Sequence, residues 1–145
     1  MKKIMKLLIL SLIISTTAAI SQNTKNVEIV TLTTQTFKQK VWNFELNKKC
    51  TRIGNLPIIL DFHATWNRQC KMMVPHLQAI QNKYKNQLIV YRIDVDKEPE
   101  LAKLFKLEAV PTIVFLDSKT TYKIGLGYKE YNDLEKLVKT YLSIN

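Results

Sequence analysis

The sequence is short of metal-binding and reactive side chains. It has two histidines, His63 and His76, and two cysteines, Cys50 and Cys70, in 145 residues. Neither histidine stands at a metal-ligand spacing from a cysteine or from the other histidine, which excludes the usual patterns of a zinc site. We therefore expect no metal and no bound cofactor.

Acidic residues are scarce relative to basic ones, 12 against 22, which gives a formal net charge of +10. The lysines and arginines are scattered along the chain, so they do not form the basic patch that nucleic-acid binding requires. The chain also lacks an internal repeat, a low-complexity tract and the length for two domains. These absences leave one compact α/β domain that does not bind nucleic acid.

A long apolar run is missing as well. The stretch from Leu7 to Ile20 is shorter than the roughly 20 residues that span a bilayer, and serines and threonines interrupt it. It follows three lysines and ends in small residues, which is the layout of a secretory signal. We predict a signal peptide over 1–21, one domain over 22–145, and a periplasmic or secreted protein with no membrane span after cleavage; an uncleaved anchor is the alternative.

Five segments have the apolar pattern of strands, and four have apolar residues at helical spacing. Their order, β-α-β-α-β-α-β-β-α, predicts a central mixed sheet with helices on both faces. Each strand-helix-strand crossover should join parallel neighbours, and the last two strands should pair antiparallel. The expected strands are 27–32, 58–62, 88–93, 112–116 and 121–124, and the expected helices begin near residues 33, 67, 97 and 131.

Capping residues indicate two of the helix starts. Thr33 or Thr34 can cap the first helix, which we expect to extend to Phe44 or Glu45. Asp96 is the expected cap of the third helix. Both caps would satisfy backbone amides that have no partner within the helix.

The segment around the second strand carries the most specific pattern in the chain. Residues 61–71 are Asp-Phe-His-Ala-Thr-Trp-Asn-Arg-Gln-Cys-Lys, and Pro75 follows them. This segment resembles the redox motif of the thioredoxin family, Asp-Phe-Trp-Ala-x-Trp-Cys-Gly-Pro-Cys-Lys. Residues 110–112, Val-Pro-Thr, resemble the cis-proline loop of that family, and Gly127 its late glycine. The resemblance covers about residues 27–142 and implies a thioredoxin fold.

The resemblance also implies a groove that binds extended polypeptides beside the motif. In that groove the backbone next to a cis proline pairs with the bound chain, which requires no cysteine. The expected groove residues are Trp66, Asn67, Val110, Pro111 and Gly127.

The first cysteine of the motif is replaced by Asn67. In a two-cysteine motif the first thiol is activated by the helix start and attacks, and the second releases the product. An amide cannot ionise at ordinary pH or bond to sulfur, so this cycle cannot run within the motif. Cys70 aligns with the second, buried cysteine, and it is either a retained structural thiol or a monothiol that forms mixed disulfides.

Asp61 aligns with a buried carboxylate of the family. In working members this group exchanges a proton with the second thiol, which makes Asp61 the expected base for Cys70. Burial should raise the pKa of Asp61, and Arg92 on the neighbouring strand could oppose that shift by its charge. Without thiol chemistry, Asp61 is an inherited polar core residue.

Cys50 could replace the missing sulfur only if it lay near Cys70. It precedes the strand 58–62 and Cys70 follows it, so five residues at about 3.3 Å each separate the two ends. A disulfide needs Cα atoms within roughly 7 Å. We therefore expect Cys50 to be a small apolar filler without a bond to Cys70.

Together these residues predict an exported protein of the thiol-disulfide oxidoreductase family that lacks dithiol reductase turnover. Any redox role would be monothiol through Cys70. The expected partners are protein or peptide thiols and disulfides and extended polypeptide segments, and we expect a monomer. A non-catalytic binding module that uses the surface of Trp66 and Pro111 is the alternative, and a separate protein that donates the missing thiol is a third interpretation.

Overall fold

Strands and helices follow one another in the predicted order. The computed structural model describes residues 26–118 and 120–144, so the predicted signal peptide lies outside the described residues. None of the helices within these ranges is long and apolar enough to cross a membrane. The elements are β1 (Val30–Thr31), α1 (Thr34–Lys40), β2 (Ile58–His63), α2 (Arg68–Lys83), β3 (Ile89–Asp94), α3 (Pro99–Leu104), β4 (Thr112–Leu116), β5 (Tyr122–Leu126) and α4 (Tyr131–Leu142).

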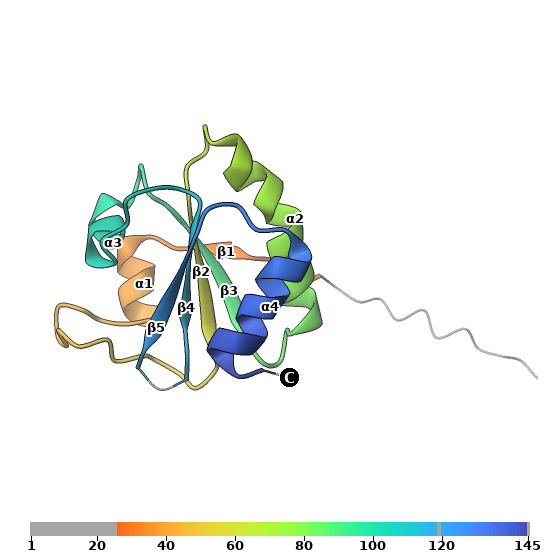
Figure 1. The fold of residues 1–145 in the computed structure, drawn as a ribbon. Coiled ribbons are helices and arrows are strands. Elements are labelled where there is room, and N and C mark those ends of the chain that lie inside the picture. The colour runs from red at the N-terminus through yellow and green to blue at the C-terminus, as the bar shows by residue number, and fades with distance from the viewer. Residues whose placement is uncertain (1–25, 119, 145) are drawn as a thin grey trace, which may run out of the picture.

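The strands form one mixed sheet in the order β1-β3-β2-β4-β5 (Figure 1). β2 and β3 are parallel neighbours joined through α2, and β4 and β5 pair antiparallel, as predicted. The other two crossovers differ from the prediction. β1 pairs with β3 rather than β2, and β4 pairs antiparallel with β2. Residues 95–111 contain only the short α3, so the chain returns to the sheet at the end of the strands where β3 stops. β4 therefore runs in the direction opposite to β2 and β3.

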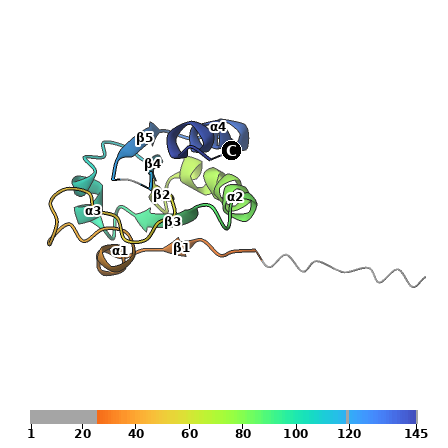
Figure 2. The ribbon, with the colours of Figure 1, turned by 90° about the horizontal axis from the view of Figure 1, so that it is seen from below.

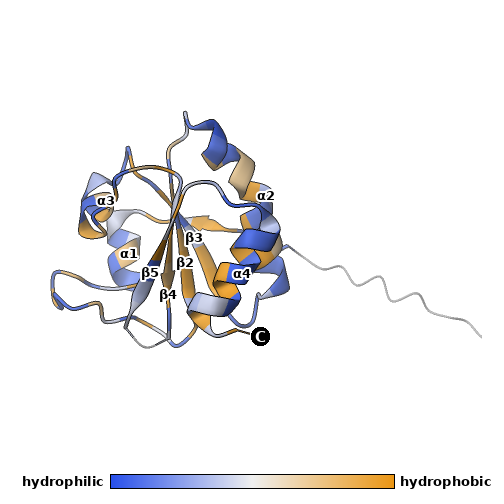
Figure 3. Cartoon of the chain, viewed as in Figure 1, coloured by the Kyte–Doolittle hydropathy of each residue, from blue (hydrophilic) through white to orange (hydrophobic). Residues whose placement is uncertain are grey.

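Helices cover both faces of the sheet, with α1 and α3 on one face and α2 and α4 on the other (Figures 1 and 2). Each face has its own apolar core, which contains Phe37 and Phe105 on the α1/α3 side and Met73 and Leu134 on the α2/α4 side. Every residue of β2 is buried because this strand lies between both layers. Figure 3 shows the same division, with hydrophobic central strands and hydrophilic outer helix surfaces.

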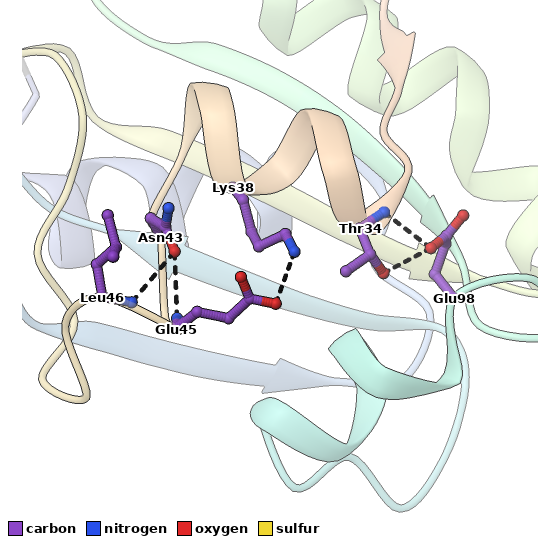
Figure 4. Close-up of polar contacts among 6 residues, drawn as sticks. All are labelled: Thr34, Lys38, Asn43, Glu45, Leu46 and Glu98. Carbon is purple, nitrogen blue, oxygen red and sulfur yellow. Dashed lines mark hydrogen bonds and ion pairs between the residues drawn. The ribbon is translucent and has the colours of Figure 1, made fainter.

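The helix caps agree with the prediction at α1 and differ from it at α3. The hydroxyl of Thr33 caps α1 by accepting a hydrogen bond from the amide of Thr36. Asp96 does not cap α3, whose N-cap is Glu98. The Glu98 carboxylate accepts hydrogen bonds from the backbone nitrogen and the hydroxyl of Thr34, at 2.8 and 2.6 Å (Figure 4). Glu98 therefore ties the start of α1 to the start of α3 instead of capping its own helix.

α1 ends at Lys40, earlier than the predicted end at Phe44 or Glu45. Asn43 explains the difference, because its side-chain oxygen accepts hydrogen bonds from the amides of Glu45 and Leu46 and turns the chain (Figure 4). Phe44 still reaches the α1/α3 core from this turn. Its apolar side chain is buried without being part of the helix.

β1 is shorter than the predicted strand 27–32. Val27 forms hydrogen bonds with the side chains of Asn82 and Gln78 on α2 rather than with a strand. Leu32 continues the contact with β3 through a backbone hydrogen bond to Arg92 at 2.8 Å. Val27 therefore contacts α2, whereas residues 30–32 pair with β3 at the edge of the sheet.

Candidate functional site

Asn67 lies at the start of α2, and its side chain forms hydrogen bonds to both the helix and a neighbouring loop. Its Oδ1 accepts a hydrogen bond from the amide of Cys70 at 3.1 Å, which makes Asn67 the N-cap of the helix. Its Nδ2 donates to the carbonyl oxygen of Val110 at 3.3 Å. The residue that replaces the first cysteine therefore joins the helix start to the loop before Pro111.

Cys70 lies in the first turn of α2 and is only 1% exposed. Burial raises the pKa of its thiol, and the nearby charge of Asp61 adds to this rise. A hydrogen bond with the backbone of Ala64 and the charge of Arg92 oppose it. The thiolate is the nucleophilic form of cysteine, so this environment disfavours reaction at Cys70.

Asp61 and Arg92 are register partners on β2 and β3 and form an ion pair. Arg92 Nε lies 2.8 Å from Asp61 Oδ2, and the Asp61 side chain is fully buried. Within the described part of the chain, Asp61 Oδ1 has no hydrogen-bond partner. Burial raises the pKa of Asp61, and the charge and hydrogen bond of Arg92 oppose the shift, as the sequence predicted. Asp61 can therefore exchange a proton at a higher pH than an exposed aspartate does.

The peptide bond between Val110 and Pro111 is cis, in agreement with the prediction. Pro111 is buried, and its carbonyl oxygen accepts a hydrogen bond from the amide of Gly127 at 2.9 Å. Gly127 has φ of +76°, in the left-handed region that favours glycine. The loops before β4 and after β5 are thus held together, and the partly exposed Val110 provides the surface beside the motif.

Trp66 is 68% exposed, and its indole nitrogen donates a hydrogen bond to the carboxylate of Asp96 at 2.9 Å. Asp96, which sequence reasoning assigned to a helix cap, therefore positions the tryptophan. The ring borders a largely apolar pocket of about 400 Å³, called here the Trp66 pocket. Its lining includes Trp66, Val95, Ala102, Leu107, Glu108 and Val110.

Leu107 is a site residue that sequence reasoning missed. It follows α3, and the preceding Lys106 has φ of +52°, which turns the chain sharply there. Leu107 packs against the α1/α3 core and also lines the Trp66 pocket. Its position after Leu101 and Leu104 of α3 was a signal for the core, but nothing in the sequence pointed to the pocket.

A second, smaller pocket of about 150 Å³ includes Cys70 in its wall, together with His63, Lys71 and Arg92. His63 is buried, and its Nε2 has no hydrogen-bond partner among residues 26–118 and 120–144. Burial lowers the pKa of His63, and the charge of Arg92 lowers it further, against the charge of Asp94. The site therefore surrounds Cys70 with uncharged and cationic groups apart from Asp61.

The two cysteines are free thiols, and both are buried. Cys50 packs in the α1/α3 core, where burial raises the pKa of its thiol. Cys70 lies at the other end of β2, at the start of α2. In the ranges that the structure describes, no three His, Cys, Asp or Glu side chains come together as a metal site.

The fold and the site define a thioredoxin-fold protein with one cysteine in its motif. The family model described as Thioredoxin matches residues 28–140, which is most of the chain. This protein belongs to the thioredoxin family, a family of thiol-disulfide oxidoreductases.

Individual relatives agree with this assignment. Thioredoxin of Borreliella burgdorferi is 30% identical over 112 residues, which cover 77% of this chain and 96% of the relative. Thioredoxin-1 of Drosophila melanogaster is 39% identical over 98 residues, which cover 66% and 92% of the two chains. The crystal structure of chloroplastic thioredoxin z matches with a TM-score of 0.62 and 19% identity over 79% of this chain and 94% of the other, which shows the shared fold.

Proposed function

We propose that this protein binds extended polypeptide segments at the thioredoxin site without dithiol turnover of its own. The observation that carries the proposal is the side chain of Asn67. It occupies the position of the attacking cysteine, and its two polar atoms are engaged with Cys70 and Val110. The motif is thus occupied by a structural bridge rather than by a nucleophile.

Dithiol reduction requires two sulfurs in sequence. The first thiolate attacks a substrate disulfide, forms a mixed disulfide and expels one substrate thiolate, which takes up a proton. The second thiolate then attacks the motif sulfur and releases the other substrate thiol. The amide of Asn67 supports neither step, and Cys70 is buried with a raised pKa.

Binding needs only the surface beside the motif. The Trp66 pocket is open and mainly apolar, and the indole of Trp66 is fixed at one border by Asp96. An exposed aromatic ring beside an apolar pocket is a common anchor for a partner side chain. Polypeptides with thiols or disulfides, the substrates of the family, and other extended segments are the proposed partners.

A monothiol role for Cys70 is the second candidate. It is favoured by the small pocket whose wall includes this thiol and the cationic Lys71 and Arg92. In such a role Cys70 would attack a disulfide, form one mixed disulfide and require an external thiol for release. Asp61 would accept the proton of Cys70.

Reduction of insulin disulfides in the presence of dithiothreitol distinguishes the two candidates. The natural chain is expected to be inert, and Asn67→Cys is expected to turn over because it supplies the attacking sulfur. Gln69→Cys is the matched control, since it adds an exposed cysteine two residues away and should stay inert. Turnover by the natural chain that Cys70→Ser abolishes would contradict the proposal and establish the monothiol role.

We also propose that the protein acts outside the cytoplasm, on the basis of the signal-like residues 1–21, and that it is a monomer there. Fractionation of expressing cells and amino-terminal sequencing of the exported product test this, and light scattering gives its mass. Retention of the full chain in the cytoplasm would contradict the location.

A further inference from the structure

Strand β5 has one covered and one open face. Gly125 faces α4, where an added Cβ would meet Phe115 at 3.3 Å and Leu137 at 3.5 Å. On the opposite face Tyr122 contacts Phe105, with ring centroids 5.3 Å apart, but α3 ends at Leu104 and leaves the rest of the strand open. Tyr122, Ile124 and Leu126 alternate along this face and are 39%, 38% and 63% exposed.

A pocket of about 320 Å³ lies on this open face, and we call it the β5 pocket. Ile124 and Leu126 form one side, and Lys106, Leu107 and Glu108 form the other. Leu107 and Glu108 also line the Trp66 pocket, so the two pockets share a wall. Apolar surface therefore continues from Trp66, across Leu107, to the last residues of β5. Contiguous apolar surface of this kind marks interaction sites more often than scattered single residues do.

β5 is also the edge strand of the sheet. It pairs with β4 on one side, and no described strand pairs with its other side (Figure 1). An edge strand can accept an extended polypeptide through backbone hydrogen bonds, and the side-chain pockets beside it then decide which sequence binds. An extended segment along β5 would place every second side chain on the face that holds the β5 pocket.

The positive charge around β5 favours an acidic partner at this surface. Lys106 lines the β5 pocket, Lys123 is exposed on β5, and Lys129 donates a hydrogen bond to the carbonyl oxygen of Leu126. Glu108 is the acidic residue of the lining. A second copy of this chain would bring the same lysines to the interface and be repelled, whereas an acidic segment would be attracted.

We propose that β5 and the β5 pocket bind an extended, acidic polypeptide segment of a partner protein, whose continuation reaches the Trp66 pocket. The inference rests on the proposed polypeptide-binding function and adds to it a second anchor and a charge preference. The bound segment carries apolar side chains on the face toward the two pockets and acidic residues on its other face, which is the face of Lys123, while Lys106 adds positive charge in the lining of the β5 pocket.

The test uses a fluorescein-labelled synthetic peptide of alternating valine and glutamate, long enough to pair with all of β5, and fluorescence anisotropy with the full chain. Leu126→Glu should weaken binding by about tenfold or more, because it removes an exposed leucine that the bound peptide would cover and adds a charge that repels the peptide. Leu46→Glu is the matched control, since Leu46 is 79% exposed in the turn after α1, and it should leave the affinity unchanged. Both variants are exposed substitutions and should keep the melting temperature of the natural chain.

A second peptide tests the preference for acidic residues. A peptide with lysine in place of glutamate should bind more weakly, and added salt should weaken the acidic peptide. The double variant Lys106→Glu, Lys123→Glu should reverse the preference between the two peptides. Equal affinity for both peptides in the natural chain would overturn the acidic class.

The two proposals fail in different ways. If Trp66→Ala abolishes peptide binding and Leu126→Glu has the effect of Leu46→Glu, the β5 anchor is wrong and the proposed function stands. If the peptide does not bind and the chain self-associates in sedimentation until Leu126→Glu disperses it, the occupant is a second copy and the inference is overturned. If neither Trp66→Ala nor Leu126→Glu changes binding, both proposals are wrong.

Discussion

The inner and outer sides of the motif differ in what they expose. On the inner side Cys70 and Asp61 are buried, and the polar atoms of Asn67 are bonded to neighbouring backbone. On the outer side Trp66 and Leu126 are both more than half exposed. In this chain the thiol that could react is buried, and the surface that could bind a partner is exposed. A thioredoxin site can thus be separated into a chemical part and a recognition part, and a single substitution at the helix start affects mainly the first.

The sharpest way to test this contrast uses adjacent methionines of α2. Met73 is fully buried in the α2/α4 core, while Met72 is 44% exposed. Met73→Ala should lower the free energy of unfolding by about 2–5 kcal/mol, because it removes buried atoms and leaves a cavity. Met72→Ala should change it by less than about 0.5 kcal/mol. Urea unfolding measures both, and equal losses would mean that the inner side is not better packed than the outer one.

Asn67→Ala should lower the free energy of unfolding by about 1 kcal/mol, because it removes the cap of α2. Asn67→Asp keeps the accepting oxygen and places a negative charge at the helix start, so it should retain most of the stability. Arg68→Ala is the exposed control. Guanidinium unfolding compares the three, and an unchanged Asn67→Ala variant would show that the bridge to Cys70 and Val110 does not stabilise the motif.

Asp61 predicts a pH dependence of stability. Because burial makes its pKa higher in the folded protein than in the unfolded chain, the folded state binds more protons between the two values. Stability from this group is complete below about pH 4, the unfolded pKa, and falls as the pH rises through the folded pKa. Asp61→Asn should remove this part of the pH profile, so the pH dependence of the variant above pH 4 should be weaker than that of the natural chain.

His63 has to be separated from Asp61 in that measurement. Its pKa is lowered in the folded state, so its contribution to stability is present above its unfolded pKa and is lost as the pH falls through the lowered value. Between its folded and unfolded pKa values the unfolded state binds more protons, so stability from His63 rises with pH, whereas stability from Asp61 falls with pH. Melting temperatures of His63→Gln and Asp61→Asn across pH 4–8 assign each slope. A pH profile of Asp61→Asn that equals the profile of the natural chain would contradict the raised pKa of Asp61.

The smallest effect is expected for thiol labelling of the folded chain. Cys50 and Cys70 are both buried, and burial raises the pKa of both thiols. Both should react with iodoacetamide at pH 7 more slowly than a free cysteine, and both should react after unfolding in urea. Rapid labelling of Cys70 alone would break the contrast between the inner and outer sides and favour the monothiol role.

Much of the fold could be predicted from local patterns. The apolar run at 58–62 identified a strand buried on both faces, and Thr33 identified the cap of α1, because both depend on residues close together in sequence. The prediction was wrong where distant contacts decide the outcome. β4 pairs with β2 and not with β3 because of where the 95–111 connection re-enters the sheet, and no residue of β4 encodes that choice by itself.

The candidate site divides in the same way. The replacement at Asn67, the identity of Cys70 and the cis bond before Pro111 followed from the sequence or from its resemblance to the family. The β5 pocket did not, because Leu126 is an ordinary strand residue whose exposure depends on how far α3 extends on the same face of the sheet.

The sequence by itself determined the alternation of strands and helices, the thioredoxin resemblance and the absence of an attacking cysteine. Only the tertiary structure decided that Glu98 holds α1, that Asp96 holds Trp66 and that Asn67 reaches Val110. These contacts join residues 64, 30 and 43 positions apart in the chain. The preference of a residue for helix, strand or turn depends on a few neighbours in the sequence. Its distant hydrogen-bond partner is fixed by the packing of whole helices and strands, and that packing exists only in the folded chain.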